Sequence, residues 1–185
     1  MKDILLSKRY AKAIFDIAIE KDAVEMVKAD LDIIASVFAE NAELRQIIAN
    51  PFVSNERKLS IFKSLFGESV SPMTIDFLAI IIEKKREDQI QYIAEQYADM
   101  YLDYKNIAIV KITSAVELDD QTLNRIAKKM ADKTTKQIQV VNVIDKKIIG
   151  GFIINMDDYQ YDASVQNVMH QLRRSFDENL FVKGY

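Results

Sequence analysis

The chain has 185 residues, of which 49% are hydrophobic, and its formal net charge is −3. This balance is typical of a globular protein with one core or two small ones, and it excludes a disordered chain. The absence of cysteine excludes disulfides, thiolate metal sites and thiol nucleophiles. The longest unbroken apolar run, residues 77–82, is far shorter than the roughly 20 residues needed to cross a bilayer.

Helical periodicity dominates the first hundred residues. Apolar residues recur at alternating steps of three and four in two stretches: Val24, Val27, Leu31, Ile34 and Phe38, and Ile90, Ile93, Tyr97, Tyr101 and Tyr104. Ser71-Pro72 supplies an N-cap followed by proline at the first helical position. We therefore predict an N-terminal six-helix bundle, with helices at 4–20, 23–39, 42–49, 55–66, 72–85 and 88–105.

The pattern changes after Asn106, where β-branched residues predict a strand at 107–116. Asp119-Asp120 then indicates the start of a helix. The remainder predicts a small mixed strand–helix domain, with helices at 119–132 and 164–180 and strands at 138–144, 148–156 and 159–162. The predicted fold class is thus α followed by α/β, with domains at 1–105 and 106–185.

A glycine pair, Gly150-Gly151, lies inside the strand predicted at 148–156. Its neighbours favour strands, so we expect a bulge or a close approach by another backbone rather than a loop. A phosphate-binding loop is excluded, because such a loop opens a helix whereas strand residues follow here.

Few residues in the chain could carry out chemistry. His170 is the only histidine, and helical steps place it opposite an apolar face that carries Val165, Val168, Met169, Leu172 and Phe176. Ser164 is expected to cap that helix, because no base is spaced to activate it. Asp157, Asp158 and Asp162 suggest a cation site, but their spacing fits no calcium loop and favours a hairpin turn. We predict no catalytic, cofactor or metal site.

Two helices have more apolar surface than one core requires. On 4–20, the stripe Leu6, Tyr10, Ala13 and Ile17 is continued by Ala11, Ile14, Phe15 and Ala18. On 72–85, the two stripes are Met73, Phe77, Ile80 and Ile81, and Ile75, Leu78, Ala79 and Ile82. A surface helix needs an apolar sector of about 100°. Either both helices are central and wholly buried, or one side of each lines a groove; the pattern favours neither.

Charge is distributed unevenly along the chain. Residues 105–150 carry 9 basic and 5 acidic side chains, a net charge of +4. The lysines involved could form a patch for an acidic partner or a solvated face: Lys128, Lys129, Lys133, Lys136, Lys146 and Lys147. This leaves a two-domain nucleic-acid-binding factor as the alternative function, although the acidic overall balance counts against it. A small enzyme is the third possible function.

The N-terminal basic residues could also belong to a mitochondrial presequence, but Asp3, Asp16 and Glu20 interrupt that pattern.

Four blocks along the chain resemble those of a known family, in the family's order. They are RYAKAIFDIA at 9–18, NPFVSNERK at 50–58, FLAIIIEKKR at 77–86, and IDKKIIGGFIIN at 144–155 with Asp162, Ser164 and Val165 after it. The chain thus resembles the delta subunit of F-type ATP synthases, the bacterial counterpart of the mitochondrial oligomycin-sensitivity-conferring protein. It departs from the family at Asp157-Asp158 and Ala163, where glycines are usual.

The resemblance implies a non-catalytic stator subunit without a cofactor. Such a subunit links the alpha/beta catalytic head to the b-subunit peripheral stalk, so that rotary, proton-driven ATP synthesis is coupled. In the family, the first and fifth helices form a groove for the N-terminal helix of one alpha subunit. By matching blocks, Tyr10, Ala13 and Ile80 would touch that helix, and their neighbours would be Ile17, Phe77, Ile81 and Lys84.

The resemblance also implies where the second domain binds and where the protein is found. The C-terminal domain would contact the C-terminal region of the b subunit. The chain would lie at the cytoplasmic face of the inner (plasma) membrane, associated with it only through the complex, and it would bind no nucleic acid.

Overall fold

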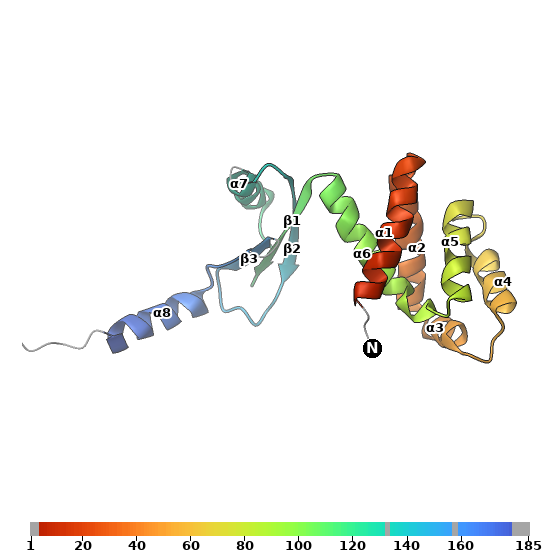
Figure 1. Cartoon of the computed structure of the whole chain (residues 1–185). Coiled ribbons are helices and arrows are strands. Elements are labelled where there is room, and N and C mark those ends of the chain that lie inside the picture. The colour runs from red at the N-terminus through yellow and green to blue at the C-terminus, as the bar shows by residue number, and fades with distance from the viewer. Residues whose placement is uncertain (1–3, 132–133, 157–158, 179–185) are drawn as a thin grey trace, which may run out of the picture. The chain divides into compact units, whose positions relative to one another are not determined.

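A computed structural model of the chain describes residues 4–131, 134–156 and 159–178 (Figure 1). The chain divides into two compact units, Met1–Tyr104 and Lys105–Tyr185. The first is helical and the second combines strands with helices, in agreement with the predicted fold class.

The N-terminal unit is built from helices joined by short connections. In chain order they are α1 (Ile4–Glu20), α2 (Val24–Glu40), α3 (Ala42–Ala49), α4 (Asn55–Phe66), α5 (Pro72–Glu83), the 3-10 turn η1 (Glu87–Gln89) and α6 (Ile90–Tyr104). The predicted cap at Ser71 is present, since Ser71 Oγ accepts a hydrogen bond from Thr74 N at 3.4 Å, and Ser54 Oγ caps α4 in the same way by accepting one from Arg57 N at 3.4 Å. The helix predicted at 88–105 differs, because its first turn is the tighter η1.

The core of this unit is one cluster to which all six α-helices contribute buried side chains. The predicted α2 stripe from Val24 to Phe38 is buried, and α1 and α2 both pack against α6. The ring of Phe15 meets Tyr97 edge-on at 5.2 Å between centroids. Burial raises the pKa of Tyr97 above its ordinary value. Its neutral hydroxyl donates to the carbonyl of Val24 at 3.0 Å, which joins α6 to α2.

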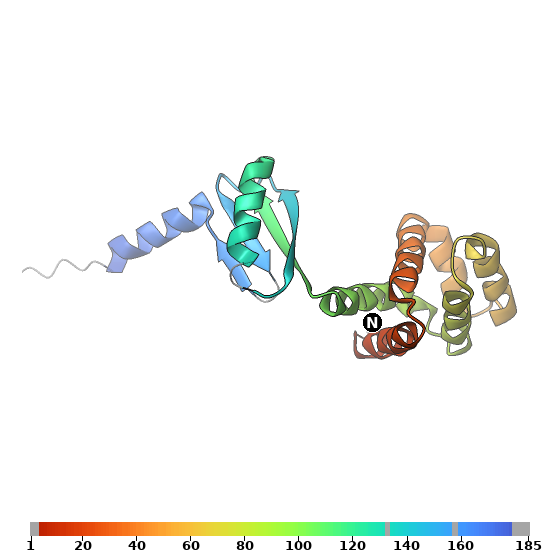
Figure 2. The ribbon, with the colours of Figure 1, turned by 90° about the horizontal axis from the view of Figure 1, so that it is seen from above.

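The C-terminal unit contains a four-stranded sheet of order β2-β1-β3-β4 (Figure 2). Its elements are β1 (Ile107–Ser114), α7 (Asp120–Ala131), β2 (Gln137–Ile144), β3 (Phe152–Met156), β4 (Tyr159–Asp162) and α8 (Val165–Glu178). Strand β1 is parallel to β2 and antiparallel to β3, and β3 is antiparallel to β4. Helix α7 makes the crossover between the two parallel strands, as parallel pairing requires.

One face of this sheet forms the small core. Val110 and Ile112 of β1, Ile154 of β3 and Ile126 of α7 are buried together there. Register pairs Ile112 with Ile154, so these side chains point to the same face. The core is small because α7 is the helix that covers this face.

The strand predicted at 148–156 is wrong in its first half. Strand β3 begins at Phe152, and residues 148–151 form the connection from β2. Gly151 has φ +77°, and a Cβ there would lie 2.2 Å from the carbonyl oxygen of Ala163. The predicted close approach by another backbone is therefore confirmed, but the expectation that the glycine pair would not lie in a loop is wrong. An apolar run does not by itself separate a strand from an exposed connection.

Candidate partner-binding site

Helix α1 buries one side and exposes the other. Ala11, Ile14, Phe15 and Ala18 face the core. Of the residues predicted to bind a partner, Ala13 is exposed, Tyr10 is half-buried and Ile17 is 44% exposed. The alternative in which the whole helix is buried is therefore wrong for α1.

Helix α5 is divided in the same way. Ile80 is 49% exposed and Lys84 is also exposed, whereas Phe77 and Ile81 lie in the core with 9% and 0% exposed. The predicted residues thus separate into surface and core members. Phe77 and Ile81 support α5 from within the bundle.

The surface members lie on two helices of the same bundle. Both α1 and α5 pack against α2 (Figures 1 and 2). We call Tyr10, Ala13, Ile17, Ile80 and Lys84 the α1–α5 face. Sequence reasoning missed three more exposed apolar residues on α1, namely Ile4, Leu5 and Ile19. Two of these precede the block that carried the family resemblance, so that block gave no reason to include them.

A buried carboxylate fixes the beginning of α5. Asp30 Oδ2 accepts hydrogen bonds from Ser71 N at 3.0 Å, Ser71 Oγ at 2.6 Å and Thr74 Oγ1 at 2.7 Å. Its negative charge also lies at the N-terminus of the helix, where the backbone N–H groups stabilise it. Asp30 interrupts an otherwise apolar stripe of α2, and this is the signal that sequence reasoning overlooked.

Polar contacts at η1 fix the other end of α5. Lys58 Nζ and Glu87 Oε1 form a buried ion pair at 2.6 Å between α4 and η1. In the same turn, Gln89 Oε1 accepts a hydrogen bond from Ser7 Oγ of α1 at 3.0 Å. The turn that follows α5 is therefore hydrogen-bonded to α1.

The predicted cap of the last helix is confirmed in the C-terminal unit. Ser164 Oγ accepts a hydrogen bond from Asn167 N at 3.2 Å, and Asp162 Oδ1 accepts one from Ser164 N at 2.9 Å. These contacts with Ser164 hold the pKa of the Asp162 carboxyl below its ordinary value. Ser164 is thus occupied as a helix cap.

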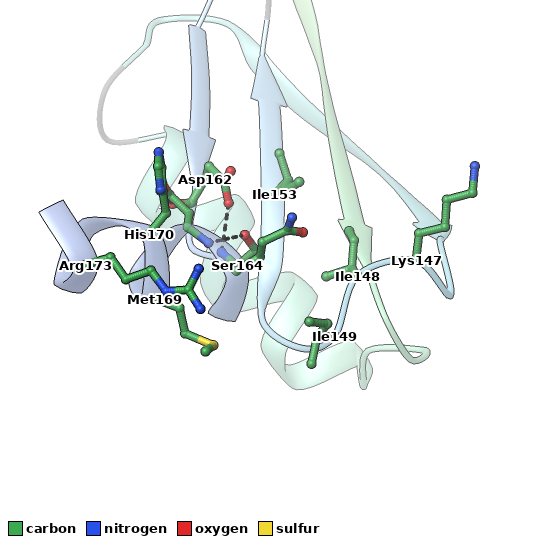
Figure 3. A pocket seen from close by; sticks show the side chains of 11 residues that line it. Lys147, Ile148, Ile149, Ile153, Asp162, Ser164, Met169, His170 and Arg173 are labelled. Carbon is green, nitrogen blue, oxygen red and sulfur yellow. Dashed lines mark hydrogen bonds between the residues drawn. The ribbon is translucent and has the colours of Figure 1, made fainter.

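The same residues border a hollow of about 860 Å³ (Figure 3). Figure 3 shows Ile148 and Ile149 of the β2–β3 connection on one side and Met169 and Arg173 of α8 on the other. His170 also lines this hollow and is exposed, as predicted. Its lining also includes Ser164, whose hydroxyl is engaged as the helix cap through Asn167 N.

The remaining predicted features are exposed or lie outside the described residues. Lys128, Lys129, Lys146 and Lys147 are exposed, Lys136 is half-buried, and Lys133, Asp157 and Asp158 lie outside the described residues. Among the residues that are described, no group of three or more potential metal ligands occurs. In that part of the chain, no helix is long and apolar enough to span a bilayer.

Comparison with known proteins gives consistent results along the chain. Residues 6–176 match the family model of the ATP synthase delta (OSCP) subunit. A protein of Cytophaga hutchinsonii named ATP synthase subunit delta is 32% identical over 180 residues, which cover 97% of this chain and 98% of that protein. The protein of the same name from Flavobacterium johnsoniae is 36% identical over 166 residues, covering 90% and 93%.

A solved structure shows the same fold. A chain in the cryo-EM structure of the Toxoplasma gondii mitochondrial ATP synthase hexamer matches with a TM-score of 0.72 and 22% identity, covering 95% of this chain and 99% of that chain. The family assignment leaves the nucleic-acid alternative without support. This chain belongs to the ATP synthase delta (OSCP) subunit family, the non-catalytic peripheral-stalk subunits of F-type ATP synthases.

Proposed function

We propose that this chain joins the catalytic head to the stalk through two separate contacts. The N-terminal unit binds the N-terminal helix of one alpha subunit at the α1–α5 face, and the C-terminal unit binds the C-terminal region of the b subunit. The observation that supports the head contact is that Ile17 of α1 and Ile80 of α5 are each about half exposed, although both helices bury their opposite sides in the core. Through the complex, the chain lies at the cytoplasmic face of the inner (plasma) membrane.

The α1–α5 face suits an amphipathic helix. Such a partner buries an apolar stripe against Ile17, Ile80 and the ring of Tyr10, and keeps its polar side in water. Lys84 lies at the edge of the face, where its exposed ammonium can meet an acidic residue of the partner. Phe77 and Ile81 contribute indirectly, because they hold Ile80 on a rigid, packed helix.

A comparison of the free energy gained by apolar burial with the free-energy cost of association indicates why a second contact is needed. Four or five apolar side chains buried at about 1.5–3 kcal/mol each provide roughly 6–15 kcal/mol. Association itself costs about 4–15 kcal/mol, so one such contact can be weak. A second attachment through the C-terminal unit raises the effective concentration at the first and makes the link durable. The net charge of +4 over residues 105–150 suits an acidic surface on the stalk.

Calorimetric titration of the full chain with a peptide of the alpha subunit's N-terminal helix tests the head contact. We expect Ile80→Asp to weaken binding at least tenfold, which is about 1.4 kcal/mol, because a charge would face an apolar helix. The chain should remain folded, since Ile80 is half exposed.

Ile47→Asp is the matched control, because Ile47 is 45% exposed on α3, away from the α1–α5 face. It should leave the affinity unchanged. Unchanged binding by Ile80→Asp, or an equal loss in both variants, would contradict the assignment. Loss of the helical circular dichroism signal in Ile80→Asp would place that residue in the core instead.

A further inference from the structure

Half of one face of the C-terminal sheet has no helix of the described residues over it. Helix α7 packs mainly against β2, the edge strand opposite β4, and its Ile126 reaches Ile154 of β3. Beside it lies a hollow of about 940 Å³ over β3 and β4. We call this hollow the β3–β4 slot; its apolar lining includes Ile126, Met130, Phe152, Ile154, Met156 and Tyr161.

The slot has the width of one helix. Neighbouring strands are about 4.8 Å apart, and a helix with its side chains is about 10 Å wide. One helix therefore covers about two strands, and a four-stranded sheet accommodates two helices side by side. α7 takes one of these places, which leaves the β3–β4 slot as the second.

Helix α8 carries an apolar stripe that the rest of the described chain does not cover. The exposed fractions of its members range from 41% to 76%, and they are Val165, Val168, Met169, Leu172 and Phe176. Figure 1 shows α8 extending away from the sheet of its own unit. Helices that pack on a sheet bury an apolar stripe of this kind against it.

We infer that in the free protein α8 folds back and places this stripe in the β3–β4 slot. Chain connectivity favours the movement, because α8 starts just after β4, the strand that forms one wall of the slot. The length of α8 is also close to that of strand β3. The 14 residues of α8 span about 21 Å, and the five residues of β3 span about 17 Å.

The opposite face of the sheet is a poorer match for the stripe. Ile109 and Val141 are partly exposed there, but Lys111, Gln139 and Asn155 lie among them. An apolar stripe on that face would bury these polar groups. The slot beside α7 has a mainly apolar lining, and its polar members Lys129 and Gln160 are exposed.

The pivot for this movement is the connection Ala163-Ser164. Besides its cap, the first turn of α8 is held by hydrogen bonds from Val165 N to Gly150 O of the β2–β3 connection at 3.0 Å and from Asn167 Nδ2 to Asp162 O of β4 at 2.9 Å. Folding back exchanges these few hydrogen bonds for burial of the whole stripe. The chain's own α8 also has the advantage over a second copy, because it is tethered at the edge of the slot.

The inference goes beyond the proposed function, and failure of the head contact would leave it standing. A docked α8 hides its stripe, so any partner that binds the stripe must first displace α8 from the slot. The apparent association constant of such a partner is its intrinsic association constant multiplied by the fraction of chains in which α8 is free.

A single tryptophan tests the fold-back, since the chain contains no tryptophan of its own. We would introduce Phe176→Trp into the full chain and measure its emission maximum and its quenching by acrylamide. The docked form predicts blue-shifted emission and several-fold weaker quenching than in the urea-unfolded chain. Adding Tyr161→Asp, which places a charge in the slot, should shift the emission to the red and restore quenching.

Val141→Asp is the matched control. It changes a partly exposed apolar residue on the other edge strand and the opposite face, so the introduced tryptophan should stay protected. If Tyr161→Asp loses its far-ultraviolet signal, Tyr159→Asp, which is more exposed and also lines the slot, takes its place. Quenching as strong as in the unfolded chain before any slot change would overturn the inference. So would protection that vanishes on dilution, because it would show a second copy as the occupant.

Discussion

At the scale of single residues, the glycine pair shows how a backbone contact fixes the start of a helix. Gly151 adopts φ +77°, and the backbone of Ala163 and Ser164 passes directly over its Cα. Gly150 is less crowded: a Cβ added there would lie 3.1 Å from Cγ2 of the Val165 side chain. The two positions therefore differ in how well they would tolerate a side chain.

Gly151→Ala is expected to destabilise the C-terminal unit by about 1–3 kcal/mol or more, because a strained φ adds to a clash with backbone that cannot move cheaply. Gly150→Ala should have a smaller effect, since a flexible valine side chain can shift. Thermal unfolding of the full chain, followed by circular dichroism, measures both. Equal stability of the two variants would contradict this account of the pair.

At the scale of elements, the ion pair between α4 and η1 holds the end of α5. Lys58 and Glu87 are both buried, so removing one partner leaves an unpaired charge in the interior. Lys58→Met should therefore lower the free energy of unfolding by about 3 kcal/mol, and Lys58→Met with Glu87→Leu should recover most of the loss. Urea unfolding of the single and double variants gives the coupling. Additive losses would show that the pair does not act as a unit.

The sequence predicted the helical elements well where periodicity and caps agreed. The α2 stripe and the Ser71-Pro72 start of α5 were both found in this way. It did not separate the buried from the exposed side of α1 and α5, because both sides of each helix are apolar. Ile17 and Ile80 became distinct from Phe77 and Ile81 only when tertiary packing was known. Asp30, Lys58 and Glu87 were missed because each forms its polar contact with a residue far away in the sequence, and no local pattern indicates that contact.

At the scale of the whole molecule, each unit offers its own apolar surface. The N-terminal unit has the α1–α5 face, and the C-terminal unit has the α8 stripe and the β3–β4 slot. A connector between a head and a stalk needs two such surfaces on one chain, because effective concentration then makes two modest contacts into a durable link. We expect loss of either contact to weaken the assembly more than its isolated affinity suggests.

The most direct test of the stator assignment is affinity purification of the tagged chain from native membranes dissolved in mild detergent, with mass spectrometry of the chains that co-purify. We predict recovery of the alpha, beta and b subunits in stable proportion, and a reduced yield of alpha and beta with Ile80→Asp. Purification without these subunits, especially with RNA or ribosomal proteins present, would contradict the assignment.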